Sequence, residues 1–153
     1  MNIPKGLLAW DGVQELDTAG DELVPDDLLD AQAAALASNI PPGSLRFVLH
    51  PSNFSALRKI KTTDGRYLIQ PDLTAGTGFT ILGTPIVLTS HLPVTKTILL
   101  DPQAIAVVVD VNPVVTILNE AYATTDSVGI RVVTRLDWAP VQPHSIIVLT
   151  TTP

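Results

Sequence analysis

Residues 45–61 read LRFVLHPSNFSALRKIK, and this stretch decides the fold class because it joins a strand to a helix at one proline. The run 45–49 is short and apolar and follows the turn-forming residues 41–43, which predicts a buried strand. Pro51 then opens a second predicted helix that runs to residue 61. Its C-terminal end carries cations, where the helix dipole favours them: Arg58, Lys59 and Lys61.

The segments on either side of this stretch complete the fold prediction. Residues 25–38 start with acidic side chains and continue rich in Ala, which predicts the first helix. Residues 1–24 are expected to form a loop or short hairpin, and residues 67–83 a looped excursion. Strands are predicted at 85–89, 97–100, 105–110, 114–119, 127–138 and 145–151. Two helices followed mainly by strands predict an α+β domain, with a mixed or antiparallel sheet flanked by two helices.

The strand at 127–138 has the clearest pattern, because apolar and polar residues alternate along it. A period of two predicts that one face packs on a core and the other meets water or a partner. The second face carries a candidate contact stripe: Arg131, Val133 and Arg135. A solvent-facing strand is an equally good interpretation of this stripe.

Length and composition limit the possible functions. A chain of 153 residues makes one domain with one core, and the absence of Cys excludes disulfides and thiolate metal sites and fits a reducing compartment. No apolar run is long enough to cross a bilayer, and the first residues do not resemble a signal peptide.

Charge is concentrated at the start of the chain. Residues 1–30 hold eight acidic side chains and one Lys, a net charge of −7, whereas the other 123 residues hold eight basic and seven acidic side chains, a net charge of +1. An acidic surface repels phosphate, which argues against general nucleic-acid binding. We interpret the acidic block as a solvated surface.

No motif predicts catalysis, a cofactor or a metal. Gly76, Gly78 and Gly83 precede a strand, so turn glycines are favoured over a dinucleotide loop. The three histidines share no ligand spacing, and the serines lack a nucleophile-elbow context. The one basic cluster is interpreted as a solvated helix end or a charged contact to another subunit: Arg58, Lys59, Lys61 and Arg66.

The order of these features resembles the tailed-phage major capsid protein of the Hong Kong 97 type. The resemblance rests on residues 45–54, on Leu-Arg-Lys at 57–59 and on Asp-Gly-Arg-Tyr-Leu at 64–68. It extends over 82–87, the strand 127–138 and the closing run 143–148, and residues 4–8 resemble the segment after the family's long helix. It therefore covers nearly the whole chain.

The resemblance implies a non-enzymatic shell subunit without cofactors. It implies that copies of the chain assemble into pentamers and hexamers, that packaged DNA is met only indirectly and that no membrane is involved. The location implied is the virion, with assembly in the cytoplasm of the bacterial host. Residues 1–123 would be mainly axial domain, and residues 124–153 would be strands of the peripheral sheet.

The family's N-terminal arm, extended loop and long spine helix would lie upstream of Met1, so the chain is expected to be a fragment with apolar strand surface exposed. The Lys–Asn cross-link of some relatives is not predicted, because the donor loop is absent. The alternatives are an encapsulin-type shell, a stand-alone module that binds a ligand or peptide at residues 71–84, and an enzyme with a carboxylate pair. The candidate subunit contacts are Arg58, Lys59, Lys61, Arg66, Arg131, Val133 and Arg135.

Overall fold

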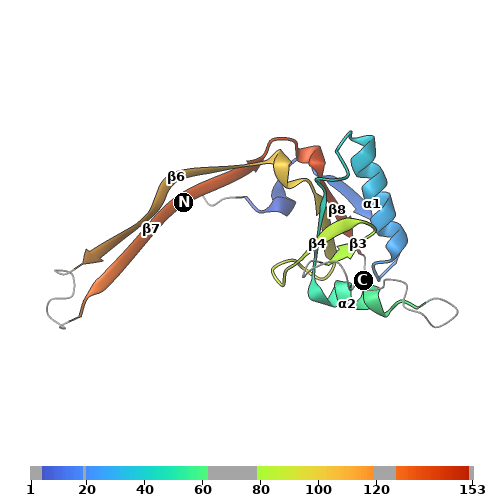
Figure 1. Cartoon of the computed structure of the whole chain (residues 1–153), viewed down its shortest axis with the longest axis horizontal. Helices are drawn as coiled ribbons and strands as arrows, with labels where there is room; N and C mark the ends of the chain where they lie inside the picture. The colour runs from blue at the N-terminus through green and yellow to red at the C-terminus, as the bar shows by residue number, and fades with distance from the viewer. Residues whose placement is uncertain (1–4, 19, 62–78, 119–126, 152–153) are drawn as a thin grey trace.

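The chain folds into a body built on a six-stranded sheet, from which a long two-stranded hairpin extends (Figure 1). The computed structural model describes residues 5–18, 20–61, 79–118 and 127–151. The predicted α+β class is confirmed, because two helices accompany a sheet that has both parallel and antiparallel pairs.

The body sheet has the strand order β1-β8-β5-β2-β4-β3. Strand β1 pairs with β8, and β2 with β4, in parallel, and the other neighbours are antiparallel. The strands are β1 (Gln14–Asp17), β2 (Arg46–Leu49), β3 (Thr80–Ile81), β4 (Thr84–Leu88), β5 (Lys96–Leu100) and β8 (Ile146–Thr150). Short 3₁₀ helices connect elements of the described chain: η1 (Leu7–Ala9), η2 (Pro102–Ala104) and η4 (Pro143–Ser145).

Strand β1 corrects the prediction of a loop or short hairpin over residues 1–24. It lies at the sheet edge, where Leu16 packs against the core. The Gln14 side chain donates from Nε2 to Ser38 Oγ at 2.8 Å and to the His144 carbonyl at 2.6 Å. These partners lie 24 and 130 residues away in sequence, so the local pattern did not reveal them.

Helix α1 (Pro25–Ala37) begins and ends as the sequence predicts. The Asp27 carboxylate accepts a hydrogen bond from the Val24 N–H at 2.9 Å, which satisfies a free donor at the helix start. The helix stops after Ala37, and Asn39, with a φ of 60°, turns the chain so that the Ile40 N–H reaches the Ala35 carbonyl.

Helix α2 (Pro51–Lys59) is shorter than the predicted span to residue 61. It begins after His50, whose Nδ1 accepts a hydrogen bond from the Ser52 N–H at 3.2 Å. His50 therefore acts as a helix cap.

The body sheet is buried on both faces. Both helices cover the face that carries Phe47, Leu49, Leu99, Ile147 and Leu149, through buried residues that include Leu28 and Leu57. The other face carries Ile98, Leu100, Ile146 and Val148 and is covered by Leu92 and by the N-terminal side chains Leu7, Leu8 and Val13. The body therefore has a closed core of its own.

The hairpin consists of β6 (Ile105–Leu118) and β7 (Gly129–Pro140), which among the described strands pair only with each other. The sequence predicted two strands where β6 is one, because Asp110, Asn112 and Pro113 interrupt the apolar run. The structure accommodates this interruption with register shifts between Val109 and Val114.

The predicted division into residues 1–123 and 124–153 separates strands that pair with each other. Strand β8 lies inside the body sheet between β1 and β5, and β6 pairs with β7 in the hairpin. The assignment of residues to an axial and a peripheral part stays a prediction.

The turn between β3 and β4 confirms Gly83 as a turn glycine. Leu82 has φ of 49° and Gly83 has φ of 76°, as a two-residue hairpin turn with two left-handed positions requires. Gly76 and Gly78 lie outside the described residues.

Candidate subunit-contact surfaces

An exposed apolar surface lies along one side of the hairpin, and we call it the apolar hairpin face. Cross-strand pairs on this side join Val107 to Trp138, Val109 to Leu136, Val115 to Val132 and Ile117 to Ile130. Apart from Trp138, each of these side chains is 52–69% exposed. Monomeric proteins rarely expose apolar patches of this extent, so the face is a candidate contact surface.

This exposure corrects one prediction. Alternation along 127–138 predicted an apolar side packed on a core, but Ile130 and Val132 are 69% and 62% exposed. The hairpin extends away from the body, so no other layer of the described chain lies behind it (Figure 1). A period of two predicts which side chains share a face, and it does not tell whether the same chain supplies the layer that covers them.

The predicted stripe Arg131, Val133 and Arg135 lies on the opposite side of β7. Arg135 approaches Asp110 with an N–O distance of 3.9 Å, and both side chains are more than 70% exposed. Val133 is half-buried and lies opposite Val114. This side is therefore mixed in character, as the rim of a protein contact usually is.

The predicted basic cluster lies elsewhere, on the body. Arg58 stacks over the Phe54 ring at 5.5 Å and is half-buried, whereas Lys59 and Lys61 are exposed. Arg66 lies outside the described residues. The structure therefore does not bring the two groups of candidate residues together, because one lies on α2 and the other on the hairpin.

An aromatic contact at the root of the hairpin was missed by sequence reasoning. Trp10 and Trp138 pack edge to face with ring centroids 5.9 Å apart, and Lys5 lies 5.4 Å from the Trp10 ring. The Trp10 indole N–H is buried without a hydrogen-bond partner. The contact joins the N-terminal segment to β7, and 128 residues of separation leave no local signal.

No group of three or more His, Asp or Glu side chains among the described residues is arranged to hold a metal. No helix of the described chain is long and apolar enough to cross a membrane.

The model of the family described as "Phage capsid family" matches residues 2–151. The chain belongs to the phage capsid family. No curated protein sequence matches it significantly.

Solved structures share its fold. A virus-like particle from Pyrococcus furiosus aligns with a TM-score of 0.65 and 22% identity over 94% of the chain. The capsid of an empty GTA particle aligns with a TM-score of 0.77 and 18% identity over 98% of the chain. Mycobacterium phage Che8 aligns with a TM-score of 0.66 and 24% identity over 91% of the chain. The phage capsid chain described here spans 58%, 57% and 53% of those three chains, respectively. The predicted Hong Kong 97-like fold is thereby confirmed.

Proposed function

We propose that this chain is a structural subunit of a phage or prophage capsid and acts by self-assembly into the shell that encloses DNA. The apolar hairpin face is the observation that carries the proposal. A closed body that extends a ribbon with seven side chains 52–69% exposed suits a subunit whose remaining contacts come from assembly. Membership of the phage capsid family supports the same function.

In this proposal each of the two sheets belongs to a different part of the capsid subunit. The body, including β8, corresponds to the axial part that packs around five-fold and six-fold axes, and residues 105–140 correspond to the peripheral part. The apolar hairpin face is then covered by protein from the rest of the shell. Arg131, Val133 and Arg135 lie on the opposite side of the ribbon and would make lesser contacts to another copy, and Arg58, Lys59 and Lys61 would contact a neighbouring body.

The finer points of the proposal concern partners, chemistry and location. The partners are other copies of the chain, in pentamers and hexamers, and packaged DNA is met only indirectly. The subunit is not an enzyme, and its place is the virion after assembly in the bacterial cytoplasm. An encapsulin complex from Synechococcus elongatus shares the fold with a TM-score of 0.70, but the family match favours the phage branch.

Expression with electron microscopy tests the proposal. The whole gene product that contains these residues is expected to form closed shells, and the 153-residue chain alone is expected to self-associate as its concentration rises. Sedimentation velocity measures this association. If the gene product forms no shell and the chain stays a monodisperse monomer at every concentration, assembly is not its function.

A further inference from the structure

The hairpin joins the body at a root where the chain crosses twice. Strand β6 begins at Ile105, directly after η2, and β7 ends at Pro140, which lies opposite Ile105 in the register. Beside these crossings the Val141 N–H donates to the Ala104 carbonyl at 2.7 Å. Two adjacent crossings leave one line about which the hairpin can turn, as at a hinge. A fixed direction of the hairpin therefore needs a further contact away from that line.

The N-terminal segment supplies such a contact (Figure 1). We call residues 5–13 the brace. Leu8 and Val13, on either side of Trp10, pack against the buried cluster on the face of the body sheet opposite the two helices. Trp10 itself packs edge to face on Trp138 of β7, with ring centroids 5.9 Å apart. The brace is thus anchored on the body and reaches the hairpin through Trp10.

Gly12 fixes the path of the chain between Trp10 and β1. Its φ of 86° lies in the left-handed region that Gly adopts without a steric cost, and an added Cβ would meet the Pro143 Cβ at 3.4 Å. The following residues enter β1, which pairs with β8 in the body sheet. The body therefore determines where the backbone at Trp10 lies.

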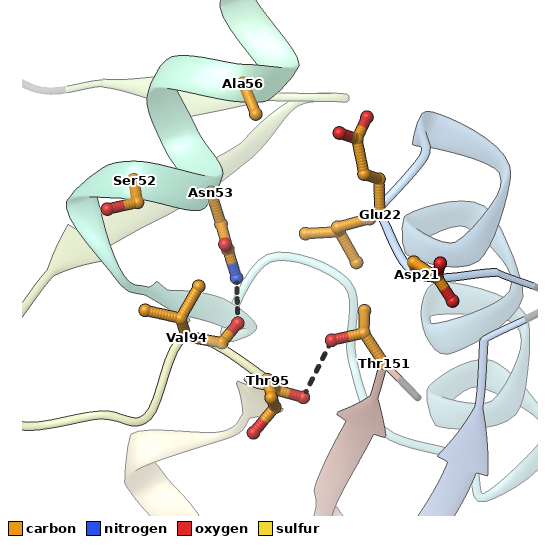
Figure 2. Close-up of a pocket in the computed structure, with 9 residues that line it drawn as sticks. Asp21, Glu22, Ser52, Asn53, Ala56, Val94, Thr95 and Thr151 are labelled. Atoms are coloured by element: carbon orange, nitrogen blue, oxygen red, sulfur yellow. Dashed lines mark hydrogen bonds between the residues drawn. The ribbon is translucent and has the colours of Figure 1, made fainter. Parts of the chain in front are cut away.

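Contacts within the body differ from the Trp10 contact, because hydrogen bonds hold the body elements together. Figure 2 shows a groove of about 350 Å³ where α2, the turn before β5 and the end of β8 meet. The Asn53 side chain donates to the Val94 carbonyl at 2.7 Å, and the Thr151 hydroxyl donates to the Thr95 carbonyl at 3.2 Å. The Trp10 indole N–H, by contrast, is buried without an acceptor in the described chain. Burial of an unpaired N–H costs free energy, which is recovered when water reaches the group.

We propose that the brace is a releasable joint: the contact of Trp10 with Trp138 holds the hairpin at one angle to the body, and separation of the two rings frees the hairpin to turn about its root. The rings can separate without breaking a hydrogen bond of the indole, and the Trp10 N–H then gains water as a partner. The joint is a property of the single chain and does not depend on the proposed assembly. In the proposed shell, it presents the apolar hairpin face in one direction before a neighbour arrives, which lowers the ordering cost of association.

The distance between two spin labels measures the hairpin angle. The chain contains no Cys, so D30C/T116C places one label at an exposed position of α1 and the other at an exposed position of the hairpin. The labelled chain is diluted with unlabelled chain, so that pulsed electron paramagnetic resonance records distances within one copy. We expect one narrow distance peak for the braced chain.

Three variants of the labelled chain separate the parts of the contact. W10A removes the ring and is expected to lower the ratio of braced to released chains about two- to tenfold, the range that aromatic pairs contribute, which broadens the peak. W10F keeps a ring and removes the N–H, so the peak should stay as narrow as in the wild type or become narrower. F79A is the matched control, because it removes an aromatic pair inside the body, where the Phe54 and Phe79 centroids lie 5.0 Å apart. It should leave the peak unchanged.

The double variant W10A/W138A tests whether the two rings act as one contact. If they do, it broadens the peak no further than W10A alone. Urea unfolding checks that each variant is folded. If W10A does not fold, W138A removes the same contact from the hairpin side.

Four results would overturn the proposal. The first two are a broad distribution in the wild type and equal distributions for the wild type and the variant that lacks one ring. The third is equal broadening by W10F and W10A, which would mean that the N–H and not the ring contact holds the hairpin. The fourth is equal broadening by F79A and W10A, which would trace the effect to lost packing in the body. A wild-type chain that shows the narrow peak but does not self-associate keeps the joint and refutes the proposed assembly alone.

Discussion

Replacing Ile117 and Ile130 by Thr tests whether the apolar hairpin face is a contact surface. The two side chains form one cross-strand pair and are 62% and 69% exposed. Complete burial of an Ile side chain is worth about 1.5–3 kcal/mol relative to exposure, so covering the exposed two-thirds is worth about 1–2 kcal/mol for each residue. Thr retains one methyl group and a good strand propensity.

The expected loss on assembly is therefore about 1 kcal/mol per residue, or about 2 kcal/mol for the pair, which corresponds to about a 30-fold weaker association. The stability of the chain itself changes by less than about 0.5 kcal/mol, because the replaced atoms are already in water. Sedimentation equilibrium measures the association and urea unfolding measures the stability.

The matched control is V114T/V133T, a cross-strand pair on the other side of the same ribbon. It makes the same kind of change at neighbouring positions, and we expect it to weaken association much less. If I117T/I130T associates as tightly as the wild type, the apolar hairpin face is not a contact surface. The same conclusion holds if the two double variants weaken association equally, since the two sides of the ribbon would then be equivalent.

Three further predictions concern single positions. L82N should raise the unfolding free energy by about 1 kcal/mol in a thermal melt, because Asn tolerates the left-handed backbone that Leu82 holds at φ 49°; an unchanged or lower melting temperature would count against the turn assignment. L99A should lower stability by about 2–5 kcal/mol in urea, since Leu99 is fully buried in the body sheet; a loss below about 1 kcal/mol would mean that the body core is loosely packed. D110N should change stability by less than about 0.5 kcal/mol at any salt concentration, because its pair with Arg135 is exposed; a larger, salt-dependent loss would show that the pair supports the hairpin.

Local patterns were sufficient to predict both helices of the body and its strands β2, β4, β5 and β8. Helix α1 has acidic residues in its first turn and Ala in its middle, and both are properties of neighbouring residues. The strand at residues 46–49 was predicted for the same reason, from a short apolar run between two turns. Gly83 was correctly read as a turn glycine because a strand follows it.

Features that depend on distant pairing were not predicted. Strand β1 is polar at Gln14, Glu15 and Asp17 and becomes a strand by pairing with β8 at the end of the chain. The contact between Trp10 and Trp138 and the groove beside Asn53 arise in the same way, from segments that meet only in the folded chain. The sequence therefore predicts which residues share a strand face, whereas the partner of that face requires the structure.

The body and the hairpin contribute to different free energies: the body to folding and the hairpin to assembly. The body core includes Phe47, Leu99 and Ile147 at 0% exposure, so burial that stabilises the fold is already complete there. The hairpin meets the body at a narrow root, through the edge-to-face tryptophan pair and the Val141 N–H that donates to the Ala104 carbonyl at 2.7 Å. Because β6 and β7 form a sheet separate from the body sheet, changes on the outer hairpin should leave body stability unaltered. The free energy of burying the apolar hairpin face is then gained on assembly and not on folding. I117T/I130T is therefore expected to change the free energy of association without changing the free energy of unfolding.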